Sequence, residues 1–536
     1  MRAFSKMLLA ASAGLALATA SNAVHAETPD DTLVVALRID DIITMDPAES
    51  FEFATADVNR NIYQKLVNFD PLNLEAGYQP EIAESWSISD DGRTLTFNIR
   101  EGLKFESGNP VTAEDVEFSL RRAVLLNKTP AFILKQLGLT ADNVAETIKA
   151  EGNTVAITTD RRYATSFVLN CLTATVGGIV DKLTAMAHEI DGDMGNEWFK
   201  TNSAGSGPYK LTGWIPNESV DLTANPNFHL GEPAMKRVLL RHVQESANQR
   251  RLLERGDIDV ARNLNSEDVK TVRNTGGLRI IEELRGRLMY FSLNQKHPEL
   301  SKPEVRQAVK YLVDYRGMES SFLDGQYVVH QNFLPKTFPG AATENPFSLN
   351  VEKAKELLAE ADVDGLELEV GVRDAQDRVE IAETLKTTFA KAGIKLSITV
   401  GPAKQILGRY RARDLDVYLG AWGPDYPDPH TNAGTFAYNP DNSDAANATG
   451  LLTWRNSWDT GGLSEKTAAA LVENDRNARA ELYGEIQAAF REISPFAVMF
   501  QKIEQAGLRN AVQNLNLGGA TTAASYWPVT KSGNQN

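Results

Sequence analysis

The chain has very little cysteine, and what surrounds its one thiol is apolar. Among 536 residues only Cys171 carries a thiol, so no disulfide can form within the chain and the fold must rest on its core. The neighbours Phe167, Val168, Leu169 and Leu172 predict a buried, unreactive cysteine.

Signatures of catalysis and of metal binding are also missing. The seven histidines are scattered, and no His-x-x-x-His spacing suggests a metal site. The stretch Gly205-Ser206-Gly207 lacks both the Gly-x-Ser-x-Gly elbow of serine hydrolases and the closing half of a phosphate loop. We therefore expect no catalytic residue, no cofactor and no metal, and we interpret this stretch as a tight turn before a strand.

Positive charge is in short supply. The formal net charge is −16, which argues against a nucleic-acid partner and against adhesion to anionic lipid. With 42% hydrophobic residues the chain can bury a sizeable core, and its length suggests two or three domains. Only one apolar run is prominent.

That run lies at the N-terminus and predicts export. Arg2 and Lys6 precede the apolar run 7–20, and Val24-His25-Ala26 supplies the small residues of a cleavage site. The run is shorter than the roughly 20 residues that a membrane anchor needs. We expect residues 1–26 to be a cleaved signal peptide, and the protein not to be a lipoprotein, because no cysteine lies at the processing site.

Several local patterns predict individual elements. Residues 32–37 read as a buried strand and residues 95–99 as a half-buried one, while Thr112 and Asp115 can cap a helix. Ser301 and Glu304 have the spacing of a second capping box, and Gly256 has the position of a helix stop.

Residues 366–428 predict parallel strands joined by helices. Apolar residues alternate in 366–372 and again in 394–400, a helical pattern lies between them, and a second helix leads to a strand at 415–421. In open sheets of this kind, ligands gather at the carboxyl ends of the strands. Arg373 and Asp425 follow the first and last of these strands.

In several places the sequence resembles family 5 extracellular solute-binding proteins, the receptors of peptide-type ABC importers. The resemblance rests on motifs that follow the family's order along nearly the whole chain: Asp46-Pro47, Gly205 to Leu211, the helix from Pro303 to Arg316 with Val305-Arg306-Gln307-Ala308 and Asp314, Glu352 to Leu358, Trp422 to Pro429, Leu482-Tyr483 and Glu485-Ile486-Gln487.

The resemblance implies an α/β, two-lobed periplasmic-binding-protein fold of type II, in its large cluster C form. It implies a first lobe at 27–283 with an extra subdomain at about 75–195, a second lobe at 284–499 and a return to the first lobe at 500–536. Two strands, near 284–290 and near Phe500, would cross between the lobes.

The resemblance also implies which residues touch the ligand. In dipeptide-binding members an aspartate of the tryptophan-led loop pairs with the peptide's amino group, and Asp425 holds that position. An arginine after the strand that corresponds to 366–372 holds the carboxylate, and Arg373 lies within about one position of it. Asp425 also has a structural alternative, as a turn cap before Pro427 or as the partner of a neighbouring arginine.

Aromatic and acidic neighbours complete the candidate site. Trp422 and Tyr426 can form pocket walls or pack within a lobe. Phe51 and Glu52 lie in a segment that often contacts ligand in the family, although an exposed loop is the alternative.

The sequence thus predicts a monomeric periplasmic receptor, not an enzyme, that encloses a short peptide or peptide-like solute and delivers it to an inner-membrane ABC permease. An oligosaccharide, an opine or another non-peptide solute is the alternative within this class. An exported hydrolase is the alternative from another class.

Overall fold

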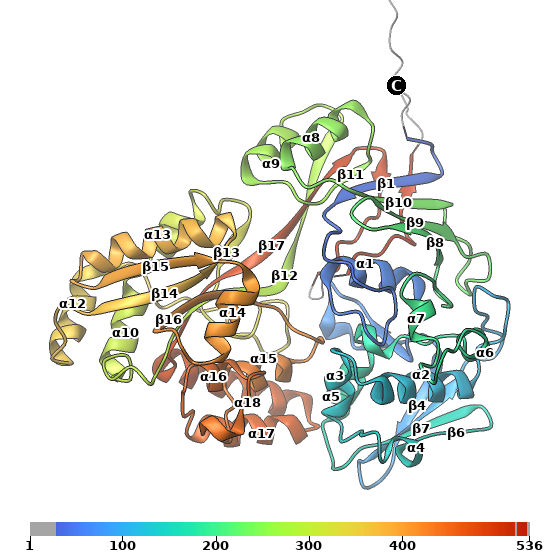
Figure 1. Ribbon diagram of the computed structural model, residues 1–536, viewed down its shortest axis with the longest axis horizontal. Coiled ribbons are helices and arrows are strands. Elements are labelled where there is room, and N and C mark those ends of the chain that lie inside the picture. The colour runs from blue at the N-terminus through green and yellow to red at the C-terminus, as the bar shows by residue number, and fades with distance from the viewer. Residues whose placement is uncertain (1–27, 520–522, 533–536) are drawn as a thin grey trace, which may run out of the picture.

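Two long antiparallel strands, β12 (Leu278–Leu293) and β17 (Phe496–Arg509), run through both halves of the molecule (Figure 1). The computed structural model describes residues 28–519 and 523–532. We call the elements before β12 and after β17 the first lobe, and those between them the second lobe. The predicted signal peptide at 1–26 lies outside the described residues.

The crossing strands are irregular where they pass between the lobes. Leu284 pairs with Ile503 and Leu288 with Gln501, so three residues of β12 oppose one residue of β17. Such a bulge interrupts the ladder and bends the strand. The predicted crossings near 284–290 and Phe500 coincide with this paired segment.

The first lobe holds one end of the large sheet, in the order β17-β11-β1-β10-β9-β8. Strand β1 is fully buried, as its continuous apolar run predicts, and pairs in parallel with β10 and β11. The remaining strands of this end are β8 (Tyr209–Ile215), β9 (Ser219–Ala224), β10 (Arg237–His242) and β11 (Val260–Ala261), beside β1 (Thr32–Leu37).

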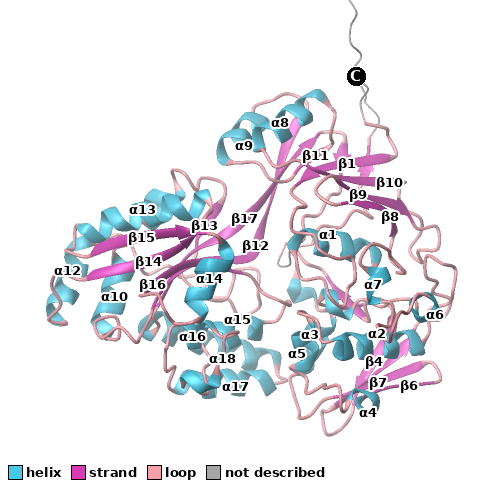
Figure 2. Ribbon diagram, in the orientation of Figure 1, coloured by secondary structure: helices cyan, strands magenta, loops and turns pink. Residues whose placement is uncertain are grey.

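A separate four-stranded sheet, in the order β4-β5-β7-β6, lies at the far end of the first lobe (Figure 2). Its strands are β4 (Ala83–Ile88), β5 (Thr94–Ile99), β6 (Ile148–Glu151) and β7 (Thr154–Thr158). Small two-stranded sheets pair β2 (Val67–Phe69) with β3 (Tyr78–Pro80) and β18 (Val512–Gln513) with β19 (Thr530–Lys531).

Helices cover these sheets. The first lobe contains α1 (Phe53–Ile62), α2 (Ala113–Leu126), α3 (Ala131–Lys135), α4 (Val144–Thr147), α5 (Thr165–Leu172), α6 (Lys182–Ala187), α7 (Asn196–Phe199), α8 (Ser246–Arg255) and α9 (Ser266–Arg273). Thr112 and Asp115 cap α2 reciprocally, as predicted, and Gly256 ends α8 with a φ of 79°.

The second lobe is built on the predicted parallel unit. Strand β14 pairs in parallel with both β15 and β16, and β16 then pairs antiparallel with β12. The strands are β13 (Tyr327–Val329), β14 (Glu367–Arg373), β15 (Lys395–Gly401) and β16 (Val417–Trp422).

The helices of the second lobe cover this sheet and form a bundle below it. They are α10 (Pro303–Tyr311), α11 (Tyr315–Glu319), α12 (Val351–Glu360), α13 (Gln376–Ala390), α14 (Ala403–Arg411), α15 (Pro429–Phe436), α16 (Leu452–Arg455), α17 (Gly462–Val472) and α18 (Arg476–Ile493). The predicted capping box at α10 is wrong. Lys302 is the N-cap, without a side-chain bond, and the Ser301 hydroxyl donates to the Pro298 carbonyl instead.

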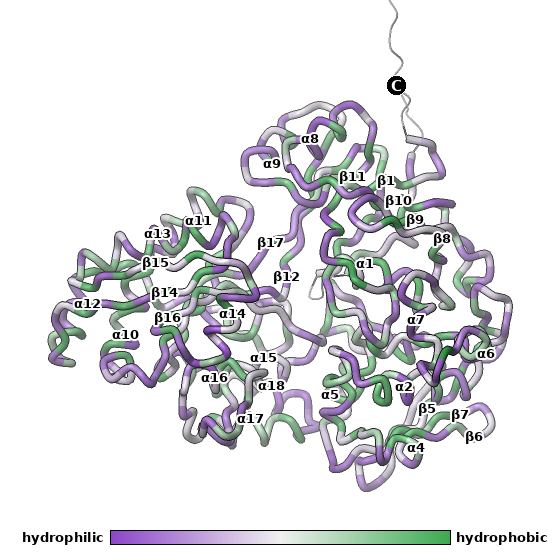
Figure 3. Tube along the Cα trace, viewed as in Figure 1, coloured by the Kyte–Doolittle hydropathy of each residue, from purple (hydrophilic) through white to green (hydrophobic). Residues whose placement is uncertain are grey.

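Each lobe has its own hydrophobic core, and along the elements of both lobes hydrophobic and hydrophilic positions alternate (Figure 3). Cys171 is fully buried among apolar side chains, and burial raises its pKa, so the predicted inert thiol is confirmed. Within the described ranges, no helix has the length and apolarity to cross a bilayer.

Candidate binding site between the lobes

Residues of both lobes enclose a cavity of about 130 Å³ beside the loop that follows β16. Because β14 and β16 run in parallel, this loop leaves the carboxyl edge of the sheet, where ligands collect in such folds. Asp425 lines the cavity together with two other predicted site residues, Phe51 and Glu52. The lining is Ser50, Phe51, Glu52, Phe53, Ala56, Pro130, Ile133, Thr175 and Val176 of the first lobe, and Gly423, Pro424 and Asp425 of the second.

Asp425 is a largely buried carboxylate without a counter-charge. Burial alone raises its pKa to about 7. Its backbone N–H donates to the Thr431 hydroxyl at 3.2 Å, but no described residue donates a hydrogen bond to its carboxylate. A buried carboxylate left in this state favours a cation brought from outside.

A second, smaller cavity of about 80 Å³ also opens beside Asp425. Arg60 and Lys65 line it, yet neither contributes to the shift of the Asp425 pKa. Burial lowers the pKa of Lys65 to about 8, and the nearby charge of Arg60 acts in the same direction.

Phe51 and Glu52 precede helix α1. Glu52 is its N-cap residue, and its carboxylate accepts the N–H of Phe51 at 3.0 Å. The Phe51 ring is 43% exposed and meets Phe132 edge-on, with the ring centroids 5.8 Å apart. The exposed face of this ring is therefore open to the cavity region.

Tyr426 and Trp422 lie on either side of Asp425 but face different surroundings. Tyr426 is buried against Phe167 of the first lobe, with the ring centroids 5.8 Å apart, and its hydroxyl bonds the Gln136 side chain at 3.1 Å. It lines the smaller cavity. Trp422 packs edge-on against Phe436 at 5.8 Å and lines neither cavity.

Arg373 is the last residue of β14, opposite Gly401 of β15. Its Nε is buried and has no hydrogen-bond partner. It lines neither of the two cavities beside Asp425. The structure therefore brings Asp425, Tyr426, Phe51 and Glu52 together around these cavities and leaves Arg373 at the adjoining strand end.

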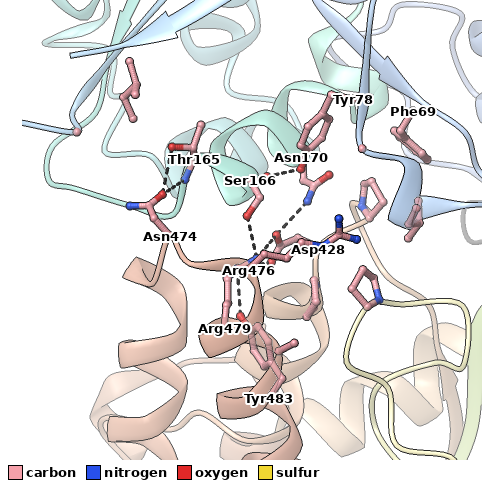
Figure 4. A pocket seen from close by; sticks show the side chains of 18 of the residues that line it. Phe69, Tyr78, Thr165, Ser166, Asn170, Asp428, Asn474, Arg476, Arg479 and Tyr483 are labelled. Carbon is pink, nitrogen blue, oxygen red and sulfur yellow. Dashed lines mark hydrogen bonds and ion pairs between the residues drawn. The ribbon is translucent and has the colours of Figure 1, made fainter. Parts of the chain in front are cut away.

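The sequence reasoning missed a buried ion pair of the second lobe that is hydrogen-bonded to the first lobe. Asp428 and Arg479, both of the second lobe, form a bidentate pair with distances of 2.8 and 2.9 Å (Figure 4). Asn170 of the first lobe donates to Asp428 at 3.0 Å, and Arg479 donates to the Ser166 hydroxyl at 3.1 Å. Asn170, Ser166, Asp428 and Arg479 are called the interlobe network below.

The residues of the interlobe network line a third cavity of about 580 Å³. Burial would raise the pKa of Asp428, but the charge and hydrogen bonds of Arg479 hold it below its ordinary value. Asp428 follows Asp425 by three residues, a proximity that could have drawn attention to it. Nothing in the sequence around Arg479 indicates its role.

The model of the bacterial extracellular solute-binding proteins, family 5, matches residues 77–444. The chain belongs to this family. It is a solute-binding receptor and not an enzyme, so the exported-hydrolase alternative is dropped, and the predicted two-lobed α/β fold is confirmed.

Similar proteins match this chain over almost its whole length. The probable D,D-dipeptide-binding periplasmic protein DdpA of Escherichia coli is 27% identical over 504 residues, which is 93% of this chain and 94% of that protein. The periplasmic protein DppA of Helicobacter pylori, solved with the peptide STSA, has a TM-score of 0.76 at 22% identity and covers 93% of this chain and 98% of its own. AgaA of A. tumefaciens, solved with agropinic acid, has a TM-score of 0.73 at 21% identity, with 94% and 99% covered.

Proposed function

We propose that this receptor captures a short peptide or peptide-like solute between its lobes and delivers it to an inner-membrane ABC permease. The observation that carries the proposal is Asp425, a partly buried carboxylate without a counter-charge in a cavity that both lobes line. A protonated amino group of the ligand supplies the missing cation. Peptide-binding relatives, including the D,D-dipeptide-binding protein, support this choice of ligand.

The other candidate residues are assigned to the wall of the site and to the end that receives the anionic group of the ligand. Phe51 and Glu52 contact the ligand from the first lobe, and Tyr426 and Trp422 hold the loop that carries Asp425. Arg373 receives the anionic end. Bidentate hydrogen bonding by a guanidinium suits a carboxylate there.

The bulged crossing of β12 and β17 is assigned as the hinge. We place the first lobe at 27–283, with its subdomain at about 75–195, the second lobe at 284–499 and the return to the first lobe at 500–536. Ligand contacts with both lobes then shift the population toward the closed form.

Export completes the proposal. A signal peptide at 1–26 is removed, and the mature protein works as a monomer in the periplasm, as the periplasmic relative suggests. An opine is the second candidate ligand, because the fold neighbour solved with agropinic acid shares this architecture.

Calorimetric titration with alanyl-alanine tests the assignment of Asp425. The Asp425→Asn variant keeps the shape of the side chain and removes its charge, so affinity falls by at least ~2 kcal/mol, the scale of a truncated buried charge pair. Asp142→Asn, at an exposed position of the first lobe, is the matched control and leaves affinity unchanged. Equal affinity of wild type and Asp425→Asn contradicts the assignment.

A further inference from the structure

Three arginines gather at the carboxyl end of β14, beside the candidate site. Arg287 lies in the bulge of β12, Arg373 ends β14, and Arg378 is in the first turn of α13. We call them the arginine cluster. The Arg287 guanidinium lies 5.8 Å from the ring centroid of Phe53, which lines the cavity of Asp425. The arginine cluster therefore borders the space between the lobes.

These cations have no anionic partners. Arg378 is only 4% exposed, and its Nε has no hydrogen-bond partner; the buried Nε of Arg373 has none either. Over residues 28–519 and 523–532, none of the three arginines forms an ion pair with a carboxylate. A buried charge in a protein is normally paired, so the buried Arg378 lacks a partner.

The cations also repel one another. Burial lowers the pKa of Arg378, and the charges of Arg287 and Arg373 lower it further. The Asp377 carboxylate, whose charge raises the pKa of Arg378, accepts the Tyr327 hydroxyl at 2.7 Å. One such carboxylate does not balance three guanidiniums.

The position of Arg378 adds to the repulsion. The N-terminus of a helix carries partial positive charge and disfavours a cation. The N-cap of α13 is Ala375, which provides no side-chain acceptor, and in the first turn only the Arg378 N–H donates to a carboxylate, that of Asp377 at 2.9 Å. An anion at this place would be stabilised by the helix terminus and by the arginine cluster together.

We propose that the arginine cluster binds the anionic end of a ligand that carries two neighbouring carboxylates. One carboxylate takes two parallel hydrogen bonds from one guanidinium, so three guanidiniums exceed what a single carboxylate satisfies. The inference rests on the proposed function, in which the ligand lies between the lobes with its cationic end at Asp425. It narrows the ligand class to acidic peptides or to non-peptide polycarboxylates of similar size.

Two pairs of ligands test the inference on the wild-type protein by calorimetry. Alanyl-glutamate binds at least about tenfold more tightly than alanyl-glutamine, which has the same shape and one charge fewer. The second pair is N-acetyl-alanyl-glutamate and N-acetyl-alanyl-glutamine. Acetylation removes the cationic amino group and with it the contribution of Asp425 to the affinity. No preference for the acidic member in either pair, including no binding at all, overturns the inference.

The outcomes also separate the inference from the function on which it rests. If alanyl-glutamate and alanyl-glutamine bind equally and both lose affinity on acetylation, the peptide-receptor proposal stands and the inference fails. If alanyl-glutamate is preferred over alanyl-glutamine only when both are acetylated, the inference stands and the assignment of Asp425 to the amino group fails. Glutarate, a dicarboxylate without a peptide bond, reveals a non-peptide source if it binds as tightly as alanyl-glutamate.

Two variants test whether the preference for alanyl-glutamate depends on the arginine cluster. Arg378→Gln abolishes the preference for alanyl-glutamate, whereas Arg316→Gln, at an exposed pair with Glu319 in the same lobe, retains it. A structural role for Arg378 would also lower the melting temperature when the arginine is removed. We expect the ligand-free Arg378→Gln variant to melt no lower than wild type, because the substitution relieves repulsion. A preserved preference in Arg378→Gln overturns the inference.

Discussion

At the scale of the residue, the notable feature is charge buried without compensation. Asp425 lacks a cation and Arg378 forms no ion pair, whereas the buried Asp46 is paired with Arg122. Leaving ions unpaired costs stability. Selection tolerates such a cost where a ligand completes the pairs.

The raised pKa of Asp425 predicts a pH-dependent affinity. With a pKa of about 7, the carboxylate is mostly protonated at pH 5.5 and mostly ionised at pH 7.5. Affinity for alanyl-alanine should therefore rise roughly tenfold or more between these values, since only the ionised form pairs with an ammonium group. Titrations at both pH values check this, and Asp425→Asn should flatten the profile.

The same shift has a consequence for stability. Because folding raises the pKa of Asp425 from its ordinary value of 3.8, its effect on stability grows less favourable as pH rises from about 4 through 7. Ligand-free Asp425→Asn should thus melt higher than wild type at pH 8, and this difference should disappear near pH 4. A wild type that melts higher at pH 8 would show that the carboxylate has a partner.

At the scale of the element, helix α5 of the first lobe contacts two parts of the second lobe, the loop before α15 and helix α18. Tyr426 enters the core of the first lobe's subdomain, and the N–H of Ala164 donates to the Leu471 carbonyl at 2.9 Å. These contacts join the two lobes.

Asn170→Ala should loosen this closure without damaging either lobe. The substitution removes one hydrogen bond to Asp428, which keeps its bidentate pair with Arg479 and the N–H of His430. We expect ligand affinity to fall by ~1 kcal/mol, mainly through faster dissociation. Stopped-flow kinetics measure the dissociation rate.

The matched control is Asn98→Ala, which removes a bond to Ser85 within the sheet of the same subdomain. It should leave the dissociation rate unchanged. If Asn170→Ala behaves like this control, the interlobe network does not hold the lobes together.

At the scale of the whole molecule, the two lobes share one sheet through β12 and β17. Each lobe has its own main core, and Tyr426 and Leu471 of the second lobe also enter the core of the first lobe's subdomain. We propose that the bulge at the crossing, which a second register shift between Met289 and Tyr290 follows, lets the lobes rotate. Ligand binding between the lobes should consequently stabilise both together.

Scanning calorimetry tests this coupling. At a free ligand concentration 100 times the Kd, a ligand that binds only the folded protein adds ~2.7 kcal/mol to the free energy of unfolding. We expect all unfolding transitions to move upward, because each lobe contributes contacts. A shift confined to one of two resolved transitions would place the site within a single lobe.

The sequence by itself determined the local elements and the fold class. Buried apolar runs predicted β1, alternation predicted β14 and β15, and Thr112 with Asp115 predicted the start of α2, because these signals depend on neighbours along the chain. The motif around Trp422 pointed to Asp425. The Ser301 pattern misled because the helix begins one residue later, with Lys302 at the N-cap, which leaves Ser301 outside the capping position.

Only the tertiary structure decided which distant residues meet. Arg479 pairs with Asp428 from 51 positions away, and Arg287 joins Arg373 and Arg378 from another strand. Their interactions follow from burial and from the geometry of β12, β14, α13 and α18, which no spacing in the sequence encodes. Whether a charge is compensated depends on everything packed around it in space, so the unpaired Asp425 and the arginine cluster became visible only in the folded molecule.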